Sequence, residues 1–246
     1  MKKTKIILIA ILVIIATLAI TYLTVGDKIA DWLWVTFTDH KQEEGMGYAK
    51  MEGNTMVITA TAGWGKVRMD SCDVDEMYDS ARRVEIRDEI KPTSIDCWFS
   101  NMPKVKTISG LEKLDVSEIT SMFYVFSYSP KLESIDGISQ WDTRSLTSIC
   151  GLFTDCDCLT TIDLSGWDTR NLNSTYRAFY HSSLVEIRGL ENWNVENLEY
   201  TGEMFAYCKD LQYIGNLDSW NLPSNANTFQ AFIGCDSLGY RPDWAN

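Results

Sequence analysis

Residues 159–184 read LTTIDLSGWDTRNLNSTYRAFYHSSL, and this stretch decides the fold because its pattern recurs on both sides of it. Four apolar columns repeat every 25 to 27 residues. They are the Phe column (Phe99, Phe126, Phe153, Phe179, Phe205, Phe232), the Trp column (Leu114, Trp141, Trp167, Trp193, Trp220), the Ile column (Ile108, Ile135, Ile162, Ile187, Ile214) and the Leu column (Val105, Leu132, Leu159, Leu184, Leu211, Leu238). A fixed period in the twenties indicates stacked supersecondary units, so we predict a repeat solenoid.

Each repeat opens with a predicted strand. Residues 159–164 match the pattern L-x-x-I-x-L, which is typical of a leucine-rich-repeat strand. Side chains alternate along a strand, so Ile162 points into the core while Thr161 and Asp163 point outward. Other repeats carry one more residue after the strand, as in Ile187-Arg188-Gly189-Leu190, which predicts a small bulge at the glycine.

The second half of each repeat predicts a turn and a short helix. An Asp or Asn follows each Trp, as in Trp167-Asp168, and favours a turn or a helix N-cap. Binding of a cation by this polar column is the alternative. Leu146, Cys150 and Phe153 then have the i, i+4, i+7 spacing of a helix. We therefore expect an α/β repeat solenoid, with a short strand and a short helix in each repeat of ~26 residues.

The repeat resembles that of the BspA-type leucine-rich-repeat surface proteins. The match is strongest at residues 159–179, at Trp141-Asp142-Thr143 and at Phe205-Ala206-Tyr207-Cys208. The resemblance implies exposure at the cell surface, and adhesion or recognition of a host surface for some members. The chain departs from the pattern in having few repeats and a degenerate one at residues 215–241, where Pro223 interrupts it.

The resemblance and the strand patterns set the expected boundaries. Residues 48–90 carry two strand-like stretches and are predicted to form a β-containing N-terminal cap, which a solenoid needs to close its first core layer. The leucine-rich-type repeats are placed at residues 91–241 and a C-terminal tail at 242–246.

The N-terminal segment is predicted to cross a membrane. Residues 6–25 contain no charged residue and follow three lysines, so residues 1–26 form a signal anchor with the N-terminus in the cytoplasm. Residues 27–47 then link this anchor to a body outside the cell. The alternative is a cleaved signal peptide, which would release the body as a secreted protein.

Charge and motif content exclude several functions. Setting aside Lys2, Lys3 and Lys5 leaves 19 of the 22 basic residues against 34 acidic ones, so the body repels nucleic acids. No phosphate loop, nucleophile elbow or zinc-protease helix occurs in the sequence. We therefore expect neither catalysis, nor a cofactor, nor a metal site. His181 is interpreted as a solvated turn residue, and the cysteines that follow the Phe column are interpreted as buried packing residues without a Cys208–Cys235 bridge.

Recognition is expected on the outward side of the strands, where side chains vary while the core columns repeat. The candidate ligand face consists of Ser134, Asp136, Thr161, Asp163, Glu186, Arg188 and Tyr213. Its predicted partner is a protein or a glycan outside the cell, because solenoids bind through extended faces of this kind. The alternative is a structural envelope protein that associates end to end with itself through residues 215–246.

Overall fold

The computed structural model describes residues 47–60 and 74–245, and all of these belong to one compact unit, Glu43–Asn246. The predicted membrane span at residues 6–25 and the linker up to residue 46 lie outside the described residues. Among the residues that are described, no helix has the length and apolar character that crossing a bilayer requires.

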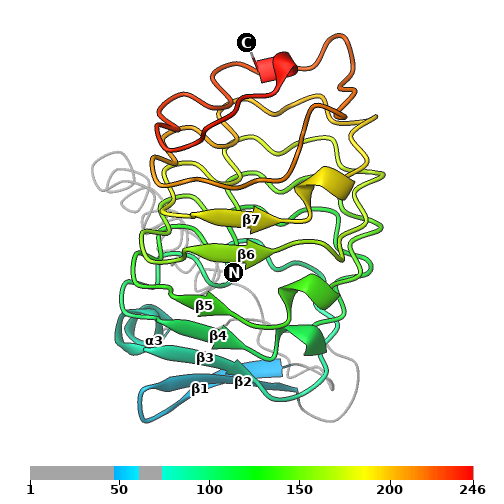
Figure 1. The fold of residues 1–246 in the computed structure, drawn as a ribbon. Coiled ribbons are helices and arrows are strands. Elements are labelled where there is room, and N and C mark those ends of the chain that lie inside the picture. The colour runs from blue at the N-terminus through cyan, green and yellow to red at the C-terminus, as the bar shows by residue number, and fades with distance from the viewer. Residues whose placement is uncertain (1–46, 61–73, 246) are drawn as a thin grey trace, which may run out of the picture. The chain divides into compact units, whose positions relative to one another are not determined.

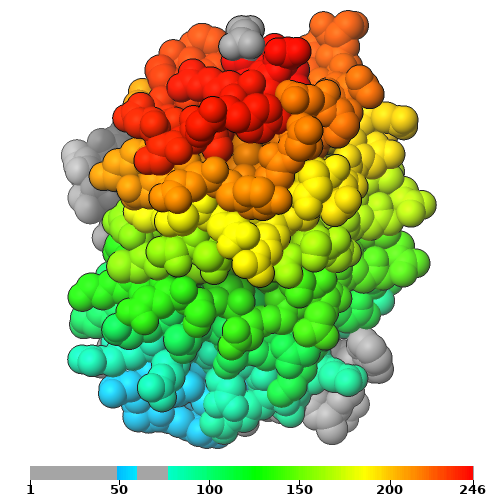
Figure 2. Space-filling model, in the orientation of Figure 1, coloured from blue at the N-terminus to red at the C-terminus, as the bar shows by residue number. Residues whose placement is uncertain are grey.

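The described residues form a β-solenoid with little helix, in which successive coils stack from β1 towards the C-terminus (Figure 1). Its elements are β1 (Gly47–Glu52), β2 (Thr55–Ala60), α3 (Val74–Ser80), β3 (Arg83–Ile86), β4 (Thr107–Ser109), β5 (Ser134–Ile135), β6 (Thr161–Asp163) and β7 (Glu186–Arg188), with 3-10 turns η1 (Leu111–Lys113), η2 (Ile138–Gln140), η3 (Leu190–Asn192) and η4 (Asp243–Ala245). The space-filling view shows the same coils as successive bands of colour (Figure 2). The predicted repeat solenoid is thus confirmed, whereas its helical component is not.

Parallel pairing joins one coil to the next on two sides. Strands β2 to β5 are neighbours in one sheet, and β6 pairs with β7 in a second. A second line of parallel bridges runs from coil to coil through Ser121, Ser148, Ser174, Tyr200 and Asn227. Because most coils are held at two places, with β5 and β6 the exception, side chains at equivalent positions lie in register along the stack.

An antiparallel hairpin starts the stack. Strand β1 pairs with β2 from Gly47↔Ala60 to Glu52↔Thr55, and β2 continues in parallel with β3. Met56 and Ile58 of β2 are fully buried and belong to the same core as the repeats. The hairpin therefore covers the first core layer, in the segment where the sequence predicts a cap.

The short helix predicted in each repeat is wrong. In the part of the chain that the structure describes, α3 is the only α-helix, and it precedes the repeats. In the stretch predicted to be helical, alternate amides bond to the next coil, and those of Leu152 and Thr154 close tight turns to Ile149 and Gly151. The amides of Ile149, Gly151, Phe153 and Asp155 donate to the carbonyls of Ser174, Tyr176, Ala178 and Tyr180.

Left-handed residues explain why no helix closes. Gly151 and Asp155 have φ values of 67° and 55°, on either side of Phe153, so the chain cannot continue the i to i−4 bonds of an α-helix. The same two positions recur in the other coils. Their non-glycine members are Cys97, Asn101, Tyr124, Tyr128, Arg177, His181, Glu203, Tyr207 and Gln230. A left-handed conformation costs about 1–2 kcal/mol for such a residue, and the bonds between coils offset this cost.

Aromatic rings fill the core as two continuous stacks. Neighbouring rings of the Phe column have centroids 4.8 to 5.8 Å apart and are almost fully buried. Neighbouring rings of the Trp column lie 6.1 to 6.4 Å apart. Trp244, in the predicted tail, extends this column by stacking on Trp220 at 5.5 Å. Its indole N–H donates to the Leu217 carbonyl at 3.1 Å, so residues 243–245 cover the end of the core.

The Asp and Asn residues after the Trp column form turns. Side-chain oxygens of Asp115, Asp142, Asp168 and Asn194 each accept the backbone N–H two residues later. Among the described residues, no group of three or more His, Cys, Asp or Glu side chains is arranged to hold a metal ion. These bonds give each of the four residues a role in forming a turn.

Three cysteines are buried thiols that bond to the Phe column. The thiols of Cys156, Cys208 and Cys235 are free and donate to main-chain carbonyls of preceding coils at 3.2, 2.8 and 2.9 Å. The structure has no bond between Cys208 and Cys235, both of which are free thiols. Burial raises the pKa of Cys208 to about 11 and that of Cys235 to about 12. Few thiolates form at neutral pH, so these groups are poor nucleophiles.

Thiol labelling checks this assignment. In the folded protein at pH 8, we expect iodoacetamide to modify the exposed Cys158 and to leave Cys156, Cys208 and Cys235 unmodified, because burial both shields them and keeps them protonated. Peptide mass mapping of native and urea-unfolded samples measures this, and the unfolded sample serves as the control for intrinsic reactivity. Labelling of Cys208 as fast as Cys158 in the native sample would contradict the burial.

Candidate recognition face

The outward side chains of the strands form one surface, the strand face, which contains all seven residues predicted as a ligand face. Thr161 pairs with Glu186, and Glu186 with Tyr213, so these residues form a column across three coils. Asp163 pairs with Arg188 in the adjacent column. Ser134 of β5 and the exposed Asp136 just after it belong to the coil before.

The strand face is interrupted between β5 and β6. Within the described residues these two strands belong to different sheets. The interruption coincides with the coil that is one residue shorter after its strand: four residues lie between Ile162 and Trp167, whereas five lie between Ile187 and Trp193. The shortened coil keeps its strand paired with β7 and its Trp167 stacked on Trp141 and Trp193, so the lost register is confined to its strand pairing with β5.

A second sign of the mismatch lies in the core. The indole N–H groups of Trp141, Trp167 and Trp220 donate to carbonyls of the preceding coil at 2.7, 3.0 and 3.0 Å. Trp193, which stacks on the shortened coil, has a buried indole nitrogen without a partner among the described residues. The coil below Trp193 thus supplies no acceptor for its indole N–H, and it is the coil that is one residue shorter.

A polar cleft of about 250 Å³ occupies the interruption. It is lined by Glu133, Ser134, Ile135, Asp136, Gly137, Ile138, Ser139, Thr161, Ile162, Asp163 and Arg188. Five of the seven predicted residues are in this list. Hydroxyl and carboxylate groups line the cleft beside strand edges that do not pair with each other, an arrangement suited to hydrogen bonds with a polar ligand.

Fixed charges surround the cleft. The Arg188 guanidinium donates twice to the Glu186 carboxylate, at 2.9 Å in both bonds. These bonds lower the pKa of Glu186. Hydrogen bonds from Ser165, whose backbone N–H is 2.9 Å from Asp163 Oδ1, lower the pKa of Asp163. Both carboxylates are therefore ionised at neutral pH, and the cleft is acidic apart from one paired arginine.

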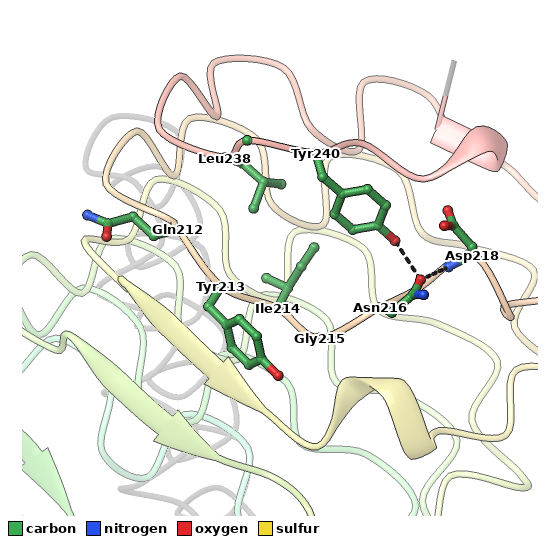
Figure 3. Close-up of a pocket in the computed structure, with 9 residues that line it drawn as sticks. Gln212, Tyr213, Ile214, Gly215, Asn216, Asp218, Leu238 and Tyr240 are labelled. Atoms are coloured by element: carbon green, nitrogen blue, oxygen red, sulfur yellow. Dashed lines mark hydrogen bonds between the residues drawn. The ribbon is translucent and has the colours of Figure 1, made fainter.

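Two further hollows continue along the strand face. One of about 370 Å³ is lined by Asp163, Ser165, Glu186, Arg188, Gly189, Glu191 and Tyr213. The other, of about 480 Å³, lies between the last two coils and includes Tyr213 and Tyr240 (Figure 3). The Tyr240 hydroxyl accepts the Leu217 N–H at 2.7 Å and is 3.3 Å from Asn216 Oδ1. Each of the seven predicted residues thus lines at least one hollow.

Comparison with family models places these coils among known sequences. A family described as "Mycoplasma protein of unknown function, DUF285" matches residues 93–220 and 187–243, which together exceed half of the chain. The chain belongs to this family. No curated protein and no solved structure gives a significant match.

The DUF285 repeats carry a second surface that sequence reasoning missed. Six of the seven large apolar or aromatic side chains that are most exposed in the described chain lie outside the strands. Phe123, Tyr176, Tyr200 and Phe229 stand at the second line of bridges or two residues after it, and Tyr128 and Tyr207 stand two residues after the Phe column. We call this the aromatic face. This face was not predicted from the sequence because its residues were assigned to a helix, and a helix would point their side chains in several directions. The recurrence of an aromatic residue at Phe123, Tyr176 and Phe229 was the sequence signal that could have revealed this face.

His181 belongs to this second surface. Its Nδ1 lies 2.6 Å from Asp155 Oδ1 of the preceding coil, and the side chain is exposed. This contact agrees with the sequence interpretation of His181 as a turn residue at the surface. The DUF285 match covers both residues, so the pair lies within the family region.

Proposed function

We propose that this chain is a membrane-tethered cell-surface recognition protein, similar to the BspA-type leucine-rich-repeat proteins, whose strand face binds a protein or glycan outside the cell. One observation carries the proposal: the seven outward positions, which vary in type while the core columns repeat, all line hollows on a single face. Solenoids typically bind through extended faces of this kind.

The charged groups of this face support binding rather than catalysis. Glu186 is held by Arg188, and Asp163 by the turn at Ser165, so both present fixed charge. Neither pairing joins a nucleophile to a general base, which is the arrangement that covalent catalysis uses. The acidic cleft favours a ligand that offers hydroxyl or amino groups.

Tethering is proposed from the sequence alone. The 20 uncharged residues 6–25 are long enough to span a bilayer, and the preceding lysines place the repeats outside the cell. Release by signal cleavage would also leave the repeats outside. In either case the strand face would meet extracellular ligands.

The strand-face variant D163A/R188A/Y213A tests the proposal. We expect the full-length protein, purified in detergent, to bind a specific member of a glycan and extracellular-matrix array, and the variant to bind it about a hundredfold more weakly or not at all. The reason is that a few charged and aromatic side chains carry most of the free energy of such an interface. Titration of the array hit by surface plasmon resonance measures the change.

The control is D157A/K209A, which removes an exposed carboxylate and an exposed amine elsewhere on the coils. It should bind like the wild type. Unchanged binding of the strand-face variant would show that the site is elsewhere. If the folded protein binds nothing on the array and self-associates, the alternative of an envelope component that assembles through residues 215–246 is favoured.

A further inference from the structure

The aromatic face contains one column in which rings alternate with small residues. Along successive coils the column reads Phe123, Cys150, Tyr176, Gly202 and Phe229. Each member stands two residues after a member of the second line of bridges, which pairs residues 121, 148, 174, 200 and 227 in parallel. The five positions are therefore in register, and a ring occurs on every second coil.

The rings of this column are open to solvent. The exposed fractions of Phe123, Tyr176 and Phe229 are 45%, 38% and 63%. Tyr176 lies close to Gly202, since a Cβ at this glycine would stand 3.5 Å from Tyr176 Cδ2, an ordinary contact distance. Cys150 and Gly202 add no ring of their own to the column.

The spacing of the rings follows from the stacking of the coils. Neighbouring strands in a sheet are ~4.8 Å apart, so rings on alternate coils are separated by roughly 10 Å. The buried Phe column supports this two-coil distance, because the ring centroids of adjacent coils at the same level are 5.3 and 5.8 Å apart. The exposed column is therefore a row of aromatic platforms with a two-coil repeat.

Polar contacts hold the middle of this row in place. The Arg177 guanidinium lies 5.1 Å from the centre of the Tyr176 ring and 4.9 Å from that of Tyr180. It donates to Glu203 Oε2 at 3.0 and 2.9 Å, and the Tyr176 hydroxyl donates to Glu203 Oε1 at 3.3 Å. Because these groups are already ordered, a ligand would lose little free energy in fixing them.

Two charged groups of this face are already engaged within the protein. The Arg177 guanidinium is paired with Glu203, and Asp155 Oδ1 lies 2.6 Å from His181 Nδ1. A charged partner would have to compete with these contacts. An uncharged partner with apolar faces and hydroxyl edges matches the rings and the groups between them.

We propose that the aromatic face binds a neutral, extended β-1,4-linked polysaccharide. In such a glycan the C–H face of a sugar ring stacks on an aromatic ring, and alternate sugars present the same face. Its disaccharide repeat is close to the two-coil spacing of Phe123, Tyr176 and Phe229. Binding here uses a different surface from the strand face and does not depend on the function proposed for that face.

Titration calorimetry with cellohexaose and chitohexaose tests the proposal, using the full-length protein in a detergent without a sugar headgroup. We expect at least one of these β-1,4-linked probes to bind, and maltohexaose, whose α-1,4 links curve the chain, to bind at least tenfold more weakly. Each single change, F123A, Y176A or F229A, should weaken binding roughly threefold to tenfold, as loss of one aromatic contact does. The triple variant should show no binding.

The conservative variant F123Y/Y176F/F229Y is the matched control, because it keeps the three rings. It should bind within about twofold of the wild type by the same stacking argument. Near-ultraviolet circular dichroism checks that each variant is folded, and the single variants keep the test valid if the triple variant is not. Absence of binding to both β-1,4-linked probes would overturn the proposal. Equal binding of maltohexaose, or unchanged binding of the triple alanine variant, would also overturn it.

Discussion

The variant F179A is expected to lower the free energy of unfolding by about 3–5 kcal/mol, the usual cost of removing a buried phenylalanine ring. Phe179 is fully buried and stacks on Phe153 at 5.8 Å and on Phe205 at 5.3 Å. Its loss therefore weakens the packing between three coils at once.

The cavity left by this change cannot collapse easily. Backbone bonds hold the coils apart at this level, since the Phe153 N–H donates to Ala178 and the Phe179 N–H to Met204. Voids that cannot relax cost the most. Neighbouring coils depend on each other in a solenoid, so we expect the whole stack to unfold at a lower urea concentration.

Urea denaturation followed by far-ultraviolet circular dichroism measures the effect. The control is F229A, which removes the same ring from a position that is 63% exposed. It should change the stability by less than about 1 kcal/mol, as surface substitutions usually do. Equal midpoints for the two variants would mean that the Phe column does not hold the coils together.

The variant G189A is expected to destabilise the protein by about 2–5 kcal/mol, through backbone strain and overpacking together. Gly189 has a φ of 94°, which disfavours any side chain. In addition, a Cβ here would stand 2.4 Å from the Cα and N atoms of Ser165. These are backbone atoms, so the shortened coil would have to move away from its neighbour and loosen the pairing of β6 with β7.

Two other glycines separate strain from crowding in thermal unfolding measurements. Gly53 also has a positive φ, of 63°, but a Cβ there meets no atom within 4 Å, so G53A should cost about 1 kcal/mol from strain alone. A Cβ at Gly239 likewise meets nothing, and its φ is not in the left-handed region, so G239A should be nearly neutral. If G189A lowers the stability no more than G53A does, the close approach of Gly189 to Ser165 is not the reason that this position requires glycine.

The strand face could be predicted because side chains along a strand alternate between the core and the surface. Alternation separates Ile162 and Ile187, which are buried, from Asp163 and Arg188, which are exposed. The cleft beside them could not be predicted. The cleft depends on how the shortened coil packs against the coil before it. The missing residue does not by itself show whether β6 loses its pairing with β5 or with β7.

The error over the helix has a specific cause. The spacing of Leu146, Cys150 and Phe153 suits a helix, but it also suits an alternation of right-handed and left-handed residues around Phe153. At Gly151 the glycine itself indicates a left-handed position in the sequence. Asp155 and Arg177 adopt the same conformation, but their residue types do not indicate it. The aromatic face was missed for the same reason, since its residues were assigned to the helix.

The sequence by itself determined the period, the core columns, the turns after each Trp and the outward positions of the strands. These features depend on residues close in the chain and on a pattern that repeats. Only the tertiary structure decided the backbone path around the Phe column, the cleft between β5 and β6 and the row of exposed rings. These depend on hydrogen bonds and fit between coils, where the partner of each residue lies about one repeat away along the chain.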